Sequence, residues 1–234
     1  MQVIIGAMGL LTLVRHGQAS FGADDYDRLS ELGERQCRLL GQYWRERGKR
    51  FSAVLVGTLK RHQQSLEAIR MGLIAMPEAL AWPGLNEFDS EALIRAYLAT
   101  QGQPGELKRP ASVEEVRQYF RLLREGLRAW MAGQIEPVGM PSHAEFAAGV
   151  AGALAHVRER CEGEVLIVSS GGPISTAVAQ VLGAPYEAAV EMNLQLRNSA
   201  LTEFVFNARK HTLQSFNHLP HLDAAGLREM VSYT

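Results

Sequence analysis

Short apolar runs and amphipathic segments alternate along the first third of the chain. Leu10–Val14 is a nearly continuous apolar run that ends in a turn, the pattern of a central parallel strand. From Ser30 to about Gly48 the apolar residues recur at helical spacing, and Ser30 is the expected N-cap. Phe51–Val56 indicates a second buried strand, and the helix after it is predicted to start at a Thr58 cap and to end before Pro77. One strand–helix–strand–helix unit is therefore predicted.

The middle of the chain has a different pattern. Between Trp82 and Pro141, prolines separate two helical stretches, near Ser90–Thr100 and Ser112–Met131, and no convincing strand occurs. The second stretch starts with the residue spacing of a capping box. We therefore expect a helical insertion, or cap, from about Phe88 to Met140 that covers the site.

Strand patterns return in the last third. Val165–Val168 is an apolar strand, followed by a glycine-rich turn and an apolar helix from about Ile174 to Leu182. Leu201–Phe206 and Thr212–Phe216 predict a closing antiparallel hairpin. Together the elements predict an α/β fold, a three-layer sandwich with a mainly parallel mixed sheet and helices on both faces, in a single domain over residues 1–234.

Composition and charge exclude several classes of protein. Hydrophobic residues make up 47% of the 234 residues and charged residues 21%, which is ordinary for a globular protein. The formal net charge of −1 gives no global electrostatic reason to expect nucleic acid or an anionic membrane as a partner. Any anion binding must therefore come from a local cluster of charge.

The cysteines and the N-terminal run indicate a protein of the reducing cytoplasm. Cys37 and Cys161 lie far apart in helix-like sequence, without the spacing of metal ligands or the density of a secreted disulfide framework. The apolar run from Met1 to Val14 lacks a basic n-region and a small-residue cleavage site, and it is too short to span a bilayer. We interpret this run as a buried strand and expect a cytoplasmic location.

The tripeptide Arg15-His16-Gly17 is the clearest candidate for chemistry. The forked guanidinium of Arg15 suits phosphate oxygens, and a neutral, oriented His16 is a competent nucleophile toward phosphorus. Gly17 permits a tight turn and the close approach of a ligand. A plain surface turn is the alternative, but the position directly after a buried strand favours a phosphate site.

This segment resembles a known family. The sequence LTLVRHGQAS is similar to the signature of the histidine phosphatases, which include phosphoglycerate mutases and many small-molecule phosphatases, and the resemblance extends over most of the chain. It implies that His16 is transiently phosphorylated and that Arg15 binds the phosphoryl group. The segment VLVGTLKRHQQSLEAI supplies Arg61 where the family has a second phosphate-binding arginine. Without the resemblance, Arg61 would be interpreted as a solvated helix charge.

The resemblance also implies a carboxylic acid as proton donor. The family carries it in a segment of the form L-x-E, and WPGLNEFDSEALIRAY places Glu87 there, with Asp89 and Glu91 as close competitors. A carboxylate that faces a phosphate-sized anion should have a raised pKa, which helps it to protonate the leaving oxygen. An exposed loop acid is the alternative reading of Glu87.

The second strand-turn departs from the family pattern. Members usually read S-H-G-G there, whereas this chain reads VLIVSSGGPIS, so that Ser170 stands where the second catalytic histidine belongs. A serine hydroxyl donates one uncharged hydrogen bond, and loss of one preorganised donor costs about 10²–10³ in turnover. The backbone N–H groups of Gly171 and Gly172 can still contact phosphate at a helix start, although such a turn is also a common packing device. We expect a slow site in which Ser170→His raises turnover.

The remaining histidines do not predict a metal site. His218 and His221 are three residues apart, but no cysteine or carboxylate completes a ligand set, so we expect no metal and no cofactor. If another group compensates for Ser170, these two histidines are the first candidates. Solvent-facing or core-satisfied positions are expected for the other four, His62, His143, His156 and His211.

The resemblance and the site residues predict a metal-independent phosphomonoester hydrolase that acts on a phosphorylated small molecule through phosphohistidine at His16. A mutase-type phosphotransferase is the nearest alternative, but the extra basic segment of such mutases is not found in the insertion. A catalytically degenerate member that binds a phosphorylated ligand or a protein is the other, and Ser170 is the argument for it. A homodimer is compatible with a sheet that ends in an exposed strand.

Overall fold

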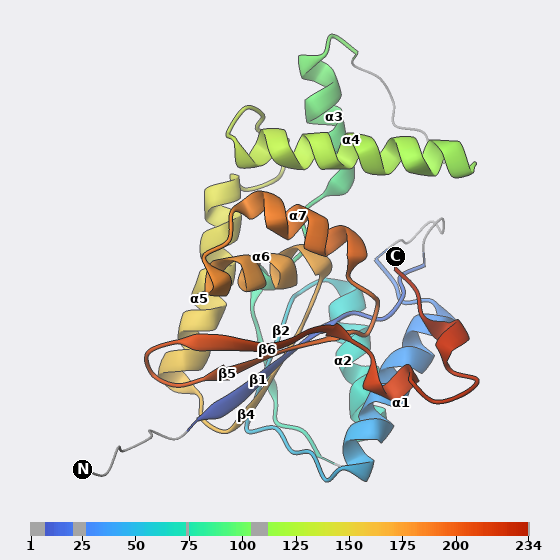
Figure 1. Ribbon diagram of the computed structural model, residues 1–234, viewed down its shortest axis with the longest axis vertical. Helices are drawn as coiled ribbons and strands as arrows, with labels where there is room; N and C mark the ends of the chain where they lie inside the picture. The colour runs from blue at the N-terminus through green and yellow to red at the C-terminus, as the bar shows by residue number, and fades with distance from the viewer. Residues whose placement is uncertain (1–7, 21–26, 74, 104–111, 234) are drawn as a thin grey trace.

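The computed structural model describes residues 8–20, 27–73, 75–103 and 112–233. Within them the chain forms an α/β fold around one six-stranded mixed sheet, in the order β3-β2-β4-β1-β5-β6 (Figure 1). The strands are β1 (Gly9–Arg15), β2 (Ala53–Val56), β3 (Ala79–Ala81), β4 (Glu164–Ser169), β5 (Leu201–Phe206) and β6 (His211–His218). The first four are parallel to one another, and β5 pairs antiparallel with both β1 and β6. The predicted fold class is confirmed.

Helices cover both faces of the sheet, which is why its central strands are almost wholly apolar. On one face α1 (Glu31–Glu46) and α2 (Lys60–Gly72) pack against inward-facing side chains of the strands, such as Val14 and Val168. On the other face α5 (His143–Arg160) and α6 (Gly171–Leu182) pack against the alternate side chains, such as Leu13 and Ile167. The sheet and the helices on its two faces make the three layers that the sequence predicts.

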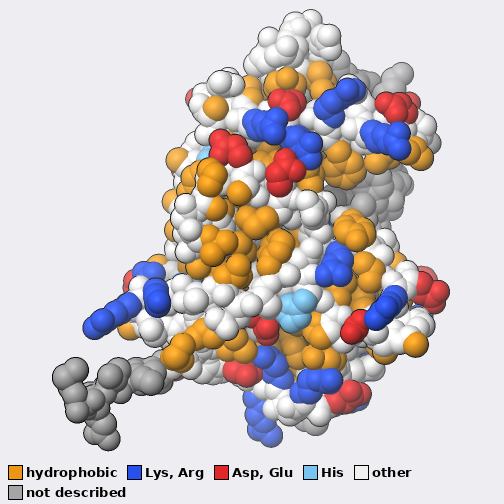
Figure 2. All heavy atoms as spheres, viewed as in Figure 1, with side chains coloured by type: hydrophobic (Ala, Val, Ile, Leu, Met, Phe, Trp, Pro, Cys, Tyr) orange, Lys and Arg blue, Asp and Glu red, His pale blue; other side chains and the backbone are white. Residues whose placement is uncertain are grey.

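A separate group of helices lies over one end of the sheet (Figure 1). It consists of α3 (Ser90–Thr100), α4 (Val113–Met131) and α7 (Tyr186–Gln195), which share a small core around Leu93, Trp130 and Val190. The first two match the predicted helices, and the capping box that starts α4 is present. On the face shown in Figure 2, basic and acidic side chains are interspersed over α3 and α4, so this face carries no patch of a single sign there.

Several predicted boundaries were wrong. Thr58 does not cap α2; the N-cap is Leu59, with no side-chain cap, because the Thr58 hydroxyl accepts a hydrogen bond from the amide of Asn86 (2.6 Å). Helix α6 begins at Gly171, earlier than expected. Sequence patterns did not predict β3, a three-residue strand directly before Trp82. They also did not predict α7, which buries only two of its residues.

The ends of the chain and the sheet complete the description. Of the N-terminal run that was expected to form a strand, residues 9–14 belong to β1, and residues 1–7 lie outside the described part. Three short 3₁₀ segments occur in the described residues, η1 (Pro83–Leu85), η2 (Pro220–Leu222) and η3 (Arg228–Met230). None of the described helices combines the length and apolar character needed to cross a membrane. The sheet ends in β3 and β6, and a homodimer along either edge stays a prediction.

Candidate functional site

Three turns meet at the carboxyl ends of the central parallel strands. His16 follows β1 and Ser170 follows β4, and these strands pair with Arg15 opposite Ser169, so the two turns lie side by side. The backbone N–H of His16 donates to the Ser169 carbonyl (2.8 Å). Strand β2 lies on the other side of β4 and leads through Gly57 into α2. The topology therefore brings together segments far apart in the sequence, at the place where open α/β sheets bind ligands.

His16 is held in the state that a nucleophile needs. Its ring is buried, and Nδ1 lies 2.7 Å from the carbonyl oxygen of Gly17. Because a carbonyl only accepts, Nδ1 carries the proton and Nε2 keeps its lone pair. Burial, followed by the positive charges of Arg61 and Arg15, holds the pKa of His16 well below its usual range. The imidazole is therefore neutral at pH 7.

Gly17 serves close packing in this structure. A side chain at Gly17 would clash with the backbone of Gly33 in α1, so only glycine allows this approach. Its N–H donates to the Ser65 hydroxyl (3.0 Å), which in turn donates to the Arg61 carbonyl (2.6 Å). The first turn of α2 is thereby tied to the loop that carries His16.

Both predicted arginines reach the site, and each is anchored. Arg61 lies in the first turn of α2, is 7% exposed, and donates through Nη1 to the Asp27 carboxylate (2.7 Å). Arg15 donates through Nη1 to the carbonyls of Leu196 and Tyr233. Both positive charges lower the pKa of His16 and also that of Glu87. The two guanidinium groups therefore lie near both side chains.

Glu87 is the carboxylate at the site, and its two competitors are elsewhere. Its Oε2 accepts from the Gly172 N–H (3.0 Å), and burial raises its pKa, against the lowering effect of that N–H and of the two arginines. Asp89 instead caps α3 by accepting from two backbone N–H groups, and Glu91 pairs with Arg95 on the surface (2.7 Å). A carboxyl with a raised pKa can hold a proton that it later donates.

The glycines after Ser170 also have a packing role. A side chain at Gly171 would clash with the Asn193 amide, and one at Gly172 would clash with the Glu87 carboxylate. The N–H of Gly172 is already engaged by Glu87. The turn therefore lets three elements approach closely, whatever contact Gly171 makes with a ligand.

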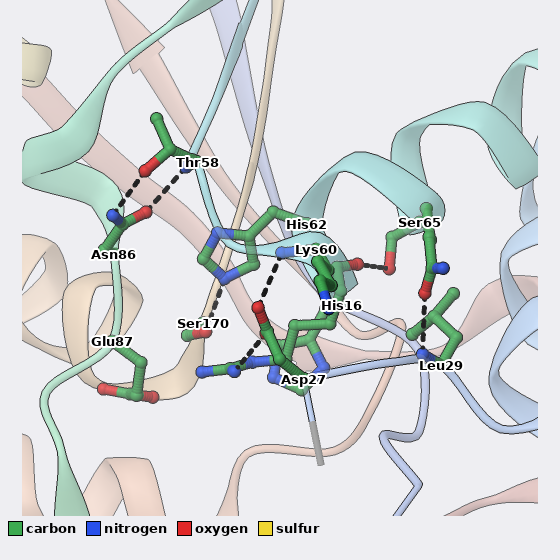
Figure 3. A network of polar contacts seen from close by, with 12 residues as sticks. His16, Asp27, Leu29, Thr58, Lys60, His62, Ser65, Asn86, Glu87 and Ser170 are labelled. Atoms are coloured by element: carbon green, nitrogen blue, oxygen red, sulfur yellow. Dashed lines mark hydrogen bonds and ion pairs between the residues drawn. The ribbon is translucent and has the colours of Figure 1, made fainter. Parts of the chain in front are cut away.

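His62 is the site residue that the sequence reading missed. It follows Arg61 in α2, is completely buried, and its Nε2 lies 2.6 Å from the Ser170 hydroxyl (Figure 3). Its ring centroid is 5.8 Å from that of His16. Burial and then Arg61 lower the pKa of His62 to about 3. Sequence patterns indicated a solvent-facing or core-satisfied His62; the structure shows it buried and hydrogen-bonded, at a place where α2 begins directly beside the end of β4.

The two histidines named as compensating candidates are engaged elsewhere. His218 pairs with Glu203 across the hairpin (3.3 Å), and His221 hydrogen-bonds the Ser199 hydroxyl (2.9 Å). The available sequence signal was the coincidence of a missing histidine at position 170 with an additional one directly after Arg61. Across the part of the chain that the structure describes, no group of three or more histidine, cysteine or acidic side chains is arranged to hold a metal ion.

Comparisons with known proteins identify the family and the fold. The profile of the histidine phosphatase superfamily (branch 1) matches residues 11–97 and 105–219. No curated protein sequence matches the chain.

Solved structures with the same fold include proteins described as phosphatases and as a phosphoglycerate mutase. A candidate alpha-ribazole-5'-P phosphatase from Escherichia coli is 21% identical, with a TM-score of 0.65 over 91% of this chain and 97% of that one. A phosphoserine phosphatase from Entamoeba histolytica, in complex with 3-phosphoglyceric acid, is 22% identical, with a TM-score of 0.59 over 92% and 99%. A phosphoglycerate mutase from Bacillus anthracis is 16% identical, with a TM-score of 0.60 over 92% and 95%. At these identities the likeness shows the fold.

Proposed function

Because the chain belongs to branch 1 of the histidine phosphatase superfamily, we propose that it hydrolyses phosphomonoesters without a metal, through phosphohistidine at His16. The observation that carries this proposal is the neutral, buried His16, whose Nδ1 donates to the Gly17 carbonyl and leaves Nε2 for attack. The chemistry needs a fixed tautomer, and the backbone supplies it.

In the first step Nε2 of His16 attacks phosphorus as the bond to the ester oxygen breaks. Glu87 gives its proton to that oxygen, and the alcohol leaves. The raised pKa of Glu87 supports this role, since an ordinary glutamate would be ionised at pH 7. Arg15 and Arg61 hold the phosphoryl oxygens and offset their negative charge.

In the second step a water molecule attacks the phosphorus of phosphohistidine. Glu87, now a carboxylate, accepts the proton of that water, and the P–N bond breaks to release phosphate and neutral His16. The same carboxyl group therefore acts as acid and then as base, which restores the starting state of both residues.

The substrate proposed here is a phosphorylated small molecule of the cytoplasm. A phosphoserine phosphatase of similar fold, solved in complex with 3-phosphoglyceric acid, supports this class. Ser170 is the specific observation that favours a second candidate, a member that binds a phosphorylated ligand without turning it over. Turnover and covalent labelling separate the two.

The first test is hydrolysis of p-nitrophenyl phosphate and of a panel of phosphorylated metabolites in excess EDTA. The second is rapid trapping of the phosphohistidine intermediate, without acid. We expect turnover and an acid-labile label at His16 in the wild type, and neither in His16→Ala. Saturable binding of phosphate without turnover or label would instead identify the degenerate binder.

A further inference from the structure

We propose that His62 and Ser170 act as one hydrogen-bonding unit on the transferred phosphoryl group, with the Ser170 hydroxyl as its donor and His62 as its positioning residue. This inference rests on the proposed function. It assigns to helix α2 a task that the family pattern assigns to the turn after β4, and it makes the serine at position 170 half of a pair.

The position of the Ser170 hydroxyl is the first observation. Ser170 is completely buried and stands between His16, on the neighbouring strand-turn, and Gly172, whose N–H binds Glu87. A carbon added at the intervening Gly171 would lie 3.7 Å from Nε of Arg15. The turn that carries this hydroxyl therefore lies beside the turn of the proposed nucleophile and binds the proposed acid through Gly172, and Figure 3 shows Ser170 together with His62 and Glu87.

The hydrogen-bond partners of the His62 ring are the second observation. Its Nδ1 has no hydrogen-bond partner among the described residues, whereas Nε2 faces the Ser170 hydroxyl at 2.6 Å. Buried N–H groups without a partner are rarer in folded proteins than buried acceptors without one. The proton therefore belongs on Nε2, which donates to Ser170 Oγ. The hydroxyl hydrogen then points away from His62 and is available to a phosphoryl oxygen.

The place for the His62 ring is built into the fold. A side chain at Gly57 would clash with Nδ1 of His62, so the ring occupies room that only glycine leaves. The Gly57 N–H donates to the Val168 carbonyl (3.1 Å), and its own carbonyl accepts from Gln63 (2.9 Å). The ring is thereby held between the ends of β2 and β4 and does not lie on the exposed face of α2.

The unit supplies a hydrogen bond and no formal charge. Burial and the neighbouring Arg61 lower the pKa of His62 and keep it neutral, so the positive charge that faces the phosphoryl group comes from the arginines. A neutral donor that is already oriented costs little reorganisation during the reaction. The pair thereby supplies in two residues the donor that a single histidine after β4 would supply.

The test is a mutant cycle with p-nitrophenyl phosphate as substrate. We expect His62→Ala and Ser170→Ala each to lower kcat by about 10- to 100-fold with a smaller change in KM. The double variant should be no slower than the slower single variant, because both changes remove the same unit. His62→Gln, which can place an amide N–H near the position of Nε2, should retain more activity than His62→Ala.

The decisive variant moves the histidine. The combined variant His62→Ala with Ser170→His removes the imidazole of α2 and places one in the turn after β4. Its kcat should therefore be at least about tenfold higher than that of His62→Ala. His211→Ala is the matched control, since His211 has a pKa lowered to about 4 by burial but stacks on Phe206 at the opposite end of β1. It should leave kcat unchanged.

Losses that add in the double variant, or a change in melting temperature without a change in kcat, would overturn the unit and leave the phosphatase proposal intact. Ser170→Ala keeps the test decisive even if His62→Ala does not fold. Wild-type turnover no higher than that of His16→Ala would remove the proposed function, and this inference with it.

Discussion

The turns after β1 and β4 are neighbours in space and similar in sequence, yet they are equipped differently. The first places its own histidine, His16, beside its own arginine, and the second places only the Ser170 hydroxyl. The imidazole next to that hydroxyl comes from α2, 108 residues away in sequence, and its Nε2 lies 2.6 Å from the oxygen. The absence of a histidine from one turn therefore does not mean that the site lacks a second imidazole, because three segments contribute side chains to it.

The largest expected effect is loss of the nucleophile from the first turn. His16→Ala should lower kcat by several decades, since a covalent nucleophile has no substitute in the second turn. The fold should survive, because the backbone N–H and carbonyl of residue 16 keep their bonds to Ser169 and Ser199. Steady-state kinetics and circular dichroism measure both. Activity within about threefold of wild type would mean that the two turns have been assigned the wrong roles.

Removal of the acid is expected to have the next largest effect. Glu87→Gln should lower the rate of phosphohistidine formation, measured in a single turnover, by about 10²–10⁴ on an alkyl phosphate and much less on p-nitrophenyl phosphate, whose leaving group needs no proton. Because burial raises the pKa of Glu87, its protonated form persists to higher pH than that of an ordinary glutamate. Wild-type activity on the alkyl phosphate should therefore fall as pH rises through that pKa, and the variant should lose this limb. Equal losses on both substrates would argue against Glu87 as the proton donor.

A histidine at position 170 is expected to help only when His62 of α2 is removed. The sequence alone predicts that Ser170→His raises turnover, but the completely buried Ser170 already has Nε2 of His62 at 2.6 Å, so two rings would compete for one space. We now expect Ser170→His by itself to lower kcat, by about tenfold, with a lower melting temperature. A gain in kcat at unchanged stability would restore the simpler view of a missing catalytic histidine.

The smallest expected effect is that of chelation. If the arginines of the first turn and of α2 balance the phosphoryl charge, excess EDTA should change kcat by less than about twofold. Initial rates with EDTA, and after readdition of Mg²⁺, Mn²⁺ or Zn²⁺, test this. Loss of activity that one of these ions restores would replace the arginine-based account of both turns.

The sequence by itself determined the main elements of the fold and one side of the site. Continuous apolar runs mark strands that are buried on both faces, and the tripeptide at the end of the first of them carries the family signature. These features depend on local spacing, which is why Leu10–Val14 and Val165–Val168 were recognised, whereas the three-residue β3 was missed. Glu87 could be named from its segment, but not separated from Asp89 and Glu91.

The tertiary structure decided what local patterns cannot encode. Burial and the Gly172 N–H select Glu87, while Asp89 is used to cap α3 and Glu91 pairs on the surface. The same holds for His62, because an ordinary helix pattern does not tell which of its faces meets the end of another strand. That meeting depends on the parallel order β2-β4-β1, in which the start of α2 and the turn after β4 share one edge of the sheet. Long-range strand order, and not the residues beside it, places a histidine of α2 against Ser170.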